Sequence, residues 1–422
     1  MHNATSAPNL SFYDYIVVGD GTAGCPLAPT LSRKANVLLL ERRGHPYGDP
    51  NITKLANFRA SLSDLSQRSP SQRFISTDGV INARARVLGG GSCLNAGFYT
   101  RAAPRICQSA VRDGLIEVGV MPFNGFTFDH INGTKVGGTI FDEQGNRHTA
   151  ADLLMYANPG ALTVLLYVTV HRILFRSKGA QHKACLKRGS KNEIILSAGA
   201  LGSSQLLMLS GIGPAAHLRS HNIRVVLDQP MVGQGMSDNH MNAVFVPSPL
   251  PVEVSLIQVV GITNFGSYIE AASGESFTTS SLASSSRFYG MFSPKIGRLS
   301  TVPPKQRTPE AIAEAIEYMN SLDQIALQGG FILEKIMDPI STGHLELQTR
   351  DPNDNPDTVM TIWHYHGGCQ VGRVVDLDYR VFGVDAPRVI DGSTYNYTPG
   401  TNPQATVMML GRYMGVKILS ER

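Results

Sequence analysis

The chain has 422 residues, of which 42% are hydrophobic and 17% carry a charge. This composition is typical of folded globular proteins and excludes a largely disordered chain, and the length suits two large domains better than one. The formal net charge is only +4 and no basic run is present. Nothing in the sequence therefore indicates a nucleic acid or an anionic membrane surface as a partner.

The sequence carries few signals of cellular compartment, disulfide bonds or metal sites. The longest apolar run, 160–170, is shorter than the roughly 20 residues that span a bilayer, and neither a membrane span nor a signal peptide is visible. The five cysteines lack C-x-x-C spacing, which argues against a disulfide framework and a metal site. Five sequons give a mild hint of secreted ancestry, and the cellular location stays open. They lie at Asn3, Asn9, Asn51, Asn132 and Asn396.

The first strong structural signal is a strand–loop–helix–strand unit near the start of the chain. Positions 15–19 read YIVVG, which predicts a buried strand. The run GDGTAG at 19–24 leads into a predicted helix that ends near residue 33. A second buried strand begins at 37 and ends in Glu41. This order of elements, with an acid 22 residues after the first glycine, is typical of a dinucleotide-binding unit.

Each part of this unit has a physical role. Gly19 permits the tight turn, Gly21 lets the backbone approach a pyrophosphate, and Gly24 lets the helix pack close to the strand. The unpaired N–H groups at the helix start would face the phosphates, and Glu41 would accept hydrogen bonds from ribose hydroxyl groups. The alternative is a plain tight turn.

A second glycine cluster, RVLGGGSCLNAG, occupies 86–97. Three consecutive glycines suit a close approach of the backbone to a flat or charged ligand. The alternative is a flexible loop, but the flanking Arg86, Ser92 and Asn95 favour a binding loop.

Apolar patterns and turn residues predict the remaining elements. Residues 241–350 differ in character, with clustered prolines and a Ser-rich stretch at 273–286, which indicates a separate domain or a lobe that covers the sheet. Predicted strands are 162–170, 173–175, 193–200 and 388–393. Predicted helices are 203–209, 309–320 with Thr308 as its N-cap, and 407–419, which Asn402 would cap ahead of Pro403.

The C-terminal part is the richest in chemistry, with WHYHGGC at 363–369 and IDGS at 390–393. With these segments the chain resembles the glucose–methanol–choline (GMC) flavin oxidoreductases, within them the plant branch of HOTHEAD-like proteins and flavin-bearing hydroxynitrile lyases. The matching blocks are 19–24 with 41–42, 85–97, 197–214, 232–233 with 238–240, 363–369 and 388–422.

The resemblance implies an α/β fold, in which an FAD-binding, Rossmann-like, doubly wound domain is joined to a second, sheet-containing substrate domain. The implied FAD-binding domain comprises 12–102, 161–240 and 363–422. The implied substrate domain comprises the shortened segment 103–160 and the truncated segment 241–362.

The resemblance also implies FAD as the cofactor. Its pyrophosphate would lie over Thr22 and Ala23, its ribose on Glu41, and its adenine near Val170. The implied cofactor-binding residues are Gly19, Gly21, Thr22, Ala23, Gly24, Glu41, Arg42, Val87, Gly91, Asn95, Ala96, Val170, Trp363, His364, Asp391, Gly392, Pro403 and Gln404.

The active-site histidine of the family begins a His-x-x-Gly motif, which corresponds to His364 here and leaves His366 a supporting or packing role. The second active-site position, His or Asn before the last helix, corresponds to Asn402. Histidine has an unperturbed pKa near 6.5 and can accept the hydroxyl proton of an alcohol. The amide of Asn402 can hold the substrate oxygen. The alternatives are a core histidine and a plain helix cap.

The sequence also departs from the family pattern. Family segments are absent after Ala102 and after Pro356, which would remove part of the substrate domain and open the flavin to water. Asp20 replaces a small neutral residue in the phosphate loop, where a carboxylate repels a pyrophosphate. Pro29 lies inside the first helix, where proline breaks a hydrogen bond. These features predict weakened FAD affinity.

The predicted function is FAD-dependent oxidation of the CH–OH group of a small-molecule alcohol, for which HOTHEAD-like relatives imply long-chain hydroxy fatty acids. One alternative is a hydroxynitrile (mandelonitrile) lyase, although the lyases tend to carry His at the position of Asn402. The other is an inactive, truncated FAD-binding remnant. The relatives are secreted, and the oligomeric state stays open.

Overall fold

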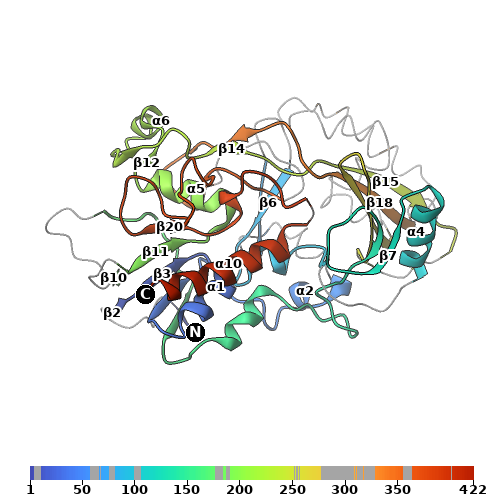
Figure 1. The fold of residues 1–422 in the computed structure, drawn as a ribbon, viewed down its shortest axis with the longest axis horizontal. Helices are drawn as coiled ribbons and strands as arrows, with labels where there is room; N and C mark the ends of the chain where they lie inside the picture. The colour runs from blue at the N-terminus through green and yellow to red at the C-terminus, as the bar shows by residue number, and fades with distance from the viewer. Residues whose placement is uncertain are drawn as a thin grey trace.

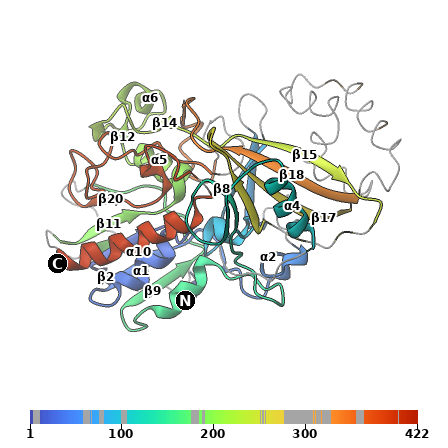
Figure 2. The same cartoon turned by 45° about the vertical axis from the view of Figure 1, so that its right-hand side comes forward.

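Two six-stranded sheets organise the chain. Figure 1 shows them at opposite ends of the long axis. In Figure 2, α1 (Gly24–Leu31) and α10 (Gln404–Ser420) lie beside the first sheet, and α4 (Ile106–Glu117) lies against the second. The computed structural model describes residues 1–3, 11–57, 66, 68–75, 81–98, 106–175, 184–186, 191–250, 252, 255, 257–276, 308, 310, 317, 328–354, 364–400 and 402–422.

The first sheet is parallel throughout and has the order β1-β9-β4-β3-β11-β20. Alternate residues of β3 enter two different cores: Ile16 and Val18 pack with α5 (Gly199–Leu209), whereas Tyr15 and Val17 pack with α1 and α10. Both faces are therefore covered, which explains the continuous apolar runs of the strands. The strands are β1 (His2–Asn3), β3 (Tyr15–Val18), β4 (Val37–Leu40), β9 (Leu162–Leu166), β11 (Glu193–Leu196) and β20 (Pro387–Val389).

Three of the predicted strands are too long. The strand predicted for 388–393 is β20, which ends at Val389 and is followed by a short 3-10 helix at Gly392–Thr394. Strand β9 ends at Leu166, because Tyr167 has a φ of 60°, a left-handed conformation that no strand continues through. The predicted extension to 170 and the strand at 173–175 are wrong. The strand predicted for 193–200 ends at Leu196, and α5 begins at Gly199, before the predicted 203, because Gly199 supplies the turn with a φ of +78°.

Helices α1 and α10 pack closely although they lie far apart in the sequence. A Cβ on Gly411 would be 2.2 Å from the carbonyl oxygen of Ala23, so only glycine fits there. The helix predicted for 407–419 is α10, but its N-cap is Pro403, so the predicted cap at Asn402 is wrong by one position.

The second sheet is antiparallel except for its last pair, and its order is β15-β18-β17-β16-β8-β7. It comes from two separate parts of the chain, 123–136 and 241–336. The presence of this sheet beside the parallel one confirms the predicted two-part α/β architecture, while the exact domain boundaries stay a prediction. Its strands are β7 (Phe123–Phe126), β8 (Gly133–Val136), β15 (Met241–Pro247), β16 (Val259–Ile262), β17 (Ser267–Ser276) and β18 (Gln328–Ile336).

Smaller elements accompany the two sheets in the described part of the chain. None of the helices in the described ranges has the length and apolar content to cross a bilayer. Most of the helix predicted for 309–320 lies outside the described residues. The smaller elements are β2 (Ser11–Tyr13) with β10 (Ala184–Leu186), β5 (Ser71–Ile75) with β6 (Ile81–Ala85), β12 (Ile212–Gly213) with β13 (Leu227–Asp228), β14 (Gln234–Met236) with β19 (Gly343–His344), α2 (Pro50–Thr53), η2 (Leu55–Asn57), η3 (Gly90–Cys93), η4 (Ala150–Tyr156), α6 (Ala215–Ser220) and η8 (Gly392–Thr394).

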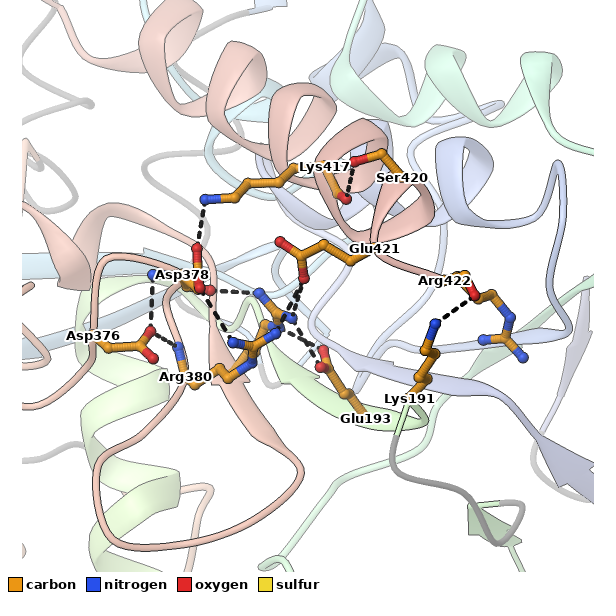
Figure 3. A network of polar contacts seen from close by, with 10 residues as sticks. Lys191, Glu193, Asp376, Asp378, Arg380, Lys417, Ser420, Glu421 and Arg422 are labelled. Carbon is orange, nitrogen blue, oxygen red and sulfur yellow. Dashed lines mark hydrogen bonds and ion pairs between the residues drawn. The ribbon is translucent and has the colours of Figure 1, made fainter.

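A buried ion pair joins β20 to the rest of the parallel sheet. Arg388 on β20 is 1% exposed, and its guanidinium donates to both carboxylate oxygens of Glu193 on β11, at 2.5 and 2.9 Å. It also donates to the carbonyl oxygen of Asp378 and to Glu421 beyond α10. Figure 3 shows how this network gathers around the end of α10. The last strand and the last helix are thus fixed by the same cation.

Replacing Arg388 by leucine should lower the free energy of unfolding by about 3–5 kcal/mol, because Glu193 would keep a buried charge without its partner. Thermal unfolding of the purified chain measures the loss. The matched control is Arg380→Leu, since Arg380 pairs with Asp378 and Glu421 at the surface and such pairs contribute about 0–1 kcal/mol. Equal losses in the two variants would contradict this account.

Pro29 lies within α1 without ending it. The helix continues to Leu31, and the N–H of Ser32 donates to the carbonyl oxygen of Ala28 at 2.9 Å. Both Leu27 and Leu31 are 0% exposed, so burial of this helix compensates for the hydrogen bond that proline cannot make.

Pro29→Ala should raise the free energy of unfolding by about 1–3 kcal/mol, because it restores a backbone donor and removes the ring from the helix interior. Pro26→Ala is the control, since Pro26 occupies the first turn, where the N–H has no partner within the helix. A Pro29→Ala chain that melts at or below the wild-type temperature would refute the expectation.

Candidate functional site

The residues predicted to bind the dinucleotide gather along one edge of the parallel sheet. Parallel strands end at a common edge, and ligands of such folds bind in the crevice outside it. Gly19 follows β3, Glu41 follows β4, and Asp391 follows β20. Val170 lies four residues beyond the end of β9 and is half-buried.

The first glycine loop has the backbone that the dinucleotide interpretation requires. Gly19 has a φ of +94°, and a Cβ there would lie 2.5 Å from the carbonyl oxygen of Ser197. A Cβ on Gly24 would lie 2.1 Å from the carbonyl oxygen of Gly19. The nearest atom to a Cβ on Gly21 would be the Cα of Gly90, at 3.8 Å. The two glycine clusters therefore approach each other so closely that a Cβ on Gly90 would lie 2.6 Å from the Cα of Gly21.

The first turn of α1 keeps hydrogen-bond donors for such a ligand. Within the described residues, no group accepts a hydrogen bond from the N–H of Thr22, Ala23 or Gly24. A Cβ added to Gly91 or Gly199 would meet no described atom within 4 Å. Unused donors at the positive end of a helix, beside glycines in open space, fit a pyrophosphate.

Glu41, the residue predicted to hold the ribose, is 6% exposed. Its Oε1 accepts a hydrogen bond from the N–H of Arg43 at 2.9 Å. The guanidinium of Arg42 donates to Gln72 at 2.8 Å and to the carbonyl oxygen of Ala85 at 3.1 Å, and burial lowers its pKa to about 10. Arg42 thus ties the first unit to the strand before the second glycine cluster.

The position of Asp20 does not match the predicted repulsion between its carboxylate and a pyrophosphate. Its side chain is 0% exposed, and its carbonyl oxygen accepts hydrogen bonds from the N–H of Gly89 and the Sγ of Cys25. Its carboxyl group lies within hydrogen-bonding reach of Glu41, and burial and the charge of Glu41 raise the pKa of Asp20 well above its usual range. The carboxyl is therefore buried and favoured in its neutral form, which removes the basis of the predicted repulsion, while the FAD affinity itself stays a prediction.

Residues predicted to hold the flavin come together from different parts of the chain. The side-chain amides of Asn95 and Gln404 hydrogen-bond to each other, which joins the second glycine cluster to the start of α10. Arg147 donates to the carbonyl oxygen of Asn95 at 2.8 Å. Val87 is buried in the small apolar cluster of this loop, and Ala96 packs on the apolar cluster of the second sheet.

Asp391 is the polar anchor at the end of β20. Its carboxylate accepts hydrogen bonds from the N–H of Gly199 at 2.9 Å, the hydroxyl of Ser203 at 2.6 Å and the N–H of Ser393 at 2.8 Å. Burial raises the pKa of Asp391, and these donors oppose that rise. The group fixes the loop with Gly392 against the start of α5.

The segment that carries the predicted active-site histidine is hydrogen-bonded to this loop. Gly367, three residues after His364, donates its N–H to the carbonyl oxygen of Gly392 at 3.1 Å, and His364 donates its own N–H to Oδ1 of Asp238 at 2.8 Å. Burial, and then the charge of Lys335, lower the pKa of His364 well below its usual range. The imidazole is therefore neutral at neutral pH.

The other residues of the C-terminal motifs have fewer contacts that bear on the site. His366 is 4% exposed, and its Nδ1 is 3.1 Å from the carbonyl oxygen of His364, as suits a supporting role. Asn402 and Pro403 are half-buried and directly precede Gln404. Trp363 lies outside the described residues.

Several groups around the imidazole were not predicted from the sequence. Nδ1 of His364 lies 3.1 Å from Nδ2 of Asn239 and 3.4 Å from the hydroxyl of Tyr268. Lys335 lies opposite Tyr268 in the β17–β18 ladder and forms a buried ion pair with Glu270. Asn239 belongs to one of the matching blocks and could have been proposed. The other three belong to no motif, because strand pairing alone brings them to the site.

Comparisons with known proteins agree with this geometry. Family models described as GMC oxidoreductase match residues 129–241 and 300–411. The chain is 46% identical to Protein HOTHEAD of Arabidopsis thaliana, over 98% of this chain and 89% of that protein. The chain belongs to the GMC oxidoreductase family. The predicted family and its cofactor, FAD, are thereby confirmed.

Other relatives of this GMC oxidoreductase differ in their named activities. It is 42% identical to an (R)-mandelonitrile lyase-like protein of Arabidopsis thaliana, over 100% of this chain and 92% of that protein. It is 38% identical to Sinalpyl alcohol oxidase Nec3 of Nesocodon mauritianus, over 100% of this chain and 89% of that protein. A solved structure of formate oxidase has the same fold, with a TM-score of 0.74 at 16% identity and 99% coverage of both chains.

The chain is shorter than its relatives within the region they share. The alignment with Protein HOTHEAD runs over 530 positions, whereas the chain has 422 residues, so more than a hundred positions have no counterpart here. Sequence analysis predicted such internal absences after Ala102 and Pro356. Both places lie outside the described residues.

Proposed function

We propose that this chain oxidises the CH–OH group of a small-molecule alcohol, with His364 exchanging the hydroxyl proton. The observation that carries the proposal is the environment of His364, whose neutral ring faces Asn239 and Tyr268 in a segment that Gly367 joins to Gly392. The alcohol oxidase among the relatives supports an alcohol as the substrate class. Within that class we propose long-chain hydroxy fatty acids, on the resemblance to HOTHEAD-like proteins.

The bound FAD supplies the hydride acceptor, and the protein supplies orientation and proton transfer. A neutral imidazole has one nitrogen with a proton and one with a lone pair. Nδ1 of His364 faces Asn239 and Tyr268, whereas no described residue bonds to Nε2. Nε2 is therefore the atom that meets the substrate hydroxyl, and the half-buried Asn402 holds the substrate oxygen in this proposal.

Asn239 determines which ring nitrogen carries the proton. Its amide nitrogen can only donate, and it faces Nδ1 at 3.1 Å, which leaves the ring proton on Nε2. A 180° turn of the carboxamide presents its oxygen to Nδ1–H instead and leaves the lone pair on Nε2. Only the second arrangement makes Nε2 a base, so the orientation of Asn239 controls proton transfer in the proposed reaction.

The second candidate function is hydroxynitrile lyase activity, which the mandelonitrile lyase-like relative supports. That reaction also uses an acid–base histidine but leaves the flavin oxidised throughout. Asn402 favours oxidation, because an amide can orient an alcohol but has no proton to exchange at neutral pH.

The deciding experiment is anaerobic mixing of the flavin-loaded chain with candidate alcohols, long-chain hydroxy fatty acids among them. Bleaching of the flavin absorbance is expected, and His364→Ala should slow it about 10²–10⁴-fold, the usual contribution of a general base. His366→Gln is the control and should retain most of the rate. Cyanide release from mandelonitrile without bleaching would establish the lyase instead, and neither signal would identify an inactive remnant.

The bleaching rate should also respond to pH through the environment of His364. Because burial and Lys335 lower its pKa, the wild-type rate should persist below pH 6.5, the usual pKa of histidine. Asn239→Asp places a carboxylate beside Nδ1, raises that pKa, and should move the acid loss of rate to higher pH. Asn239→Leu should slow bleaching by about tenfold or more without that shift, through loss of a buried hydrogen bond. Superimposable profiles for wild type and Asn239→Asp would contradict the assignment.

A further inference from the structure

The carboxyl group of Asp20 has an environment that an ionised side chain does not tolerate. It is 0% exposed, and neither of its oxygens accepts a hydrogen bond from a neighbouring residue in the described part of the chain. An isolated buried carboxylate is strongly destabilised, so such a group keeps its proton. A protonated carboxyl is a donor and needs an acceptor. The acceptor within reach is Glu41, whose Oε1 already accepts the N–H of Arg43.

The backbone prevents Asp20 from escaping this position. Its carbonyl oxygen accepts hydrogen bonds from the N–H of Gly89 at 2.9 Å and from the Sγ of Cys25 at 2.8 Å. Gly90, in the facing loop, approaches so closely that a Cβ on it would lie 2.6 Å from the Cα of Gly21. The residue is therefore held between the two glycine clusters, with its side chain beneath them.

Among the described residues, no cation acts on Asp20 in place of that proton. The titratable groups facing Asp20 are Glu41 at the end of β4, Cys25 on α1 and Cys93 on η3. Burial raises the pKa of Cys25 and raises that of Cys93 to about 12, so both thiols are neutral. Arg42 is the cation beside Glu41, but its guanidinium is engaged by Gln72 and Ala85.

We propose that Asp20 is a neutral carboxylic acid in the folded protein and that it donates a hydrogen bond to Glu41, so that the two side chains form one singly charged acceptor for the ribose hydroxyl groups of the dinucleotide. Asp20 is then a positioning residue for Glu41. The inference rests on the FAD site and not on the proposed alcohol chemistry, so either can fail without the other.

The first test is the pH dependence of stability. Unfolded Asp20 ionises near pH 3.9, whereas the folded chain keeps the proton, so wild-type stability should fall as pH rises from 5 to 8. Asp20→Asn removes this titration. Relative to D20N, the unfolding constant of the wild-type chain should rise about tenfold per pH unit, about 1.4 kcal/mol. Parallel pH profiles of the two chains, each measured without added flavin, would overturn the proposal.

A second variant and a second measurement test the proposal if the D20N chain does not fold. Asp20→Gly should give the same divergence from wild type with pH. Infrared spectra of the wild-type chain labelled with ¹³C-aspartate should contain the carbonyl band of a buried protonated carboxyl at pH 7, and D20G should lack it. A wild-type spectrum without that band at pH 7 would show an ionised Asp20 and sink the idea.

The third test concerns the cofactor and separates this proposal from simple repulsion. Because the pair carries one negative charge and Asp20 positions Glu41, D20G should bind FAD at pH 7 with a dissociation constant equal to or larger than that of wild type. An ionised Asp20 near the phosphates would instead weaken wild-type binding more than tenfold, by Coulomb's law for two unit charges about 8 Å apart at an effective dielectric constant near 20. D20G that binds FAD more than tenfold tighter than wild type would therefore refute the neutral acid.

Discussion

The buried ion pair between Arg388 and Glu193 is the interaction on which the rest of the molecule depends. Strand β20 comes from the far end of the chain and pairs only with β11 in the parallel sheet. Asp391 and Gly392 follow the end of β20, and Gly392 accepts a hydrogen bond from Gly367 in the segment that carries His364. Both parts therefore take their position from that strand. Burying a charge pair in this place costs desolvation energy, and loss of one partner would leave the other charge buried and unpaired. The last strand therefore keeps its arrangement only while both partners are present.

Burial controls protonation at both ends of the proposed site. At one end, His364 and Tyr268 lie among dehydrated polar groups, where burial lowers the pKa of the imidazole and raises that of the phenol. Both groups are therefore neutral at neutral pH. At the other end, burial raises the pKa of Asp20. The same low dielectric thus favours the neutral forms of an acid, Asp20, and a base, His364, at two separate places in the proposed site.

The parts predicted from sequence are those encoded by local patterns. The unit around Gly19 and Glu41 was predicted almost in full, because its glycine spacing, its apolar runs and the acid at the end of the second strand each indicate one local structure. Tyr167 shows the limit, since a positive φ at a tyrosine leaves no local signal and the strand was predicted too long. Tyr268 and Lys335 were missed because an antiparallel ladder joins residues 67 positions apart. Asp20 was recognised as unusual, but the direction of its side chain, which reverses its electrostatic effect, depends on tertiary packing.

The close packing of α10 on α1 has a consequence for how the protein is made. The two helices begin at residues 24 and 404, and a ribosome adding about 5–20 residues per second needs roughly 20–75 s to travel between them. During that time the apolar side of α1 that α10 will cover has no partner in the nascent chain. The nucleotide-binding half of the protein therefore matures after synthesis has passed its last helix, and chaperones have a long window in which to hold the early segments apart.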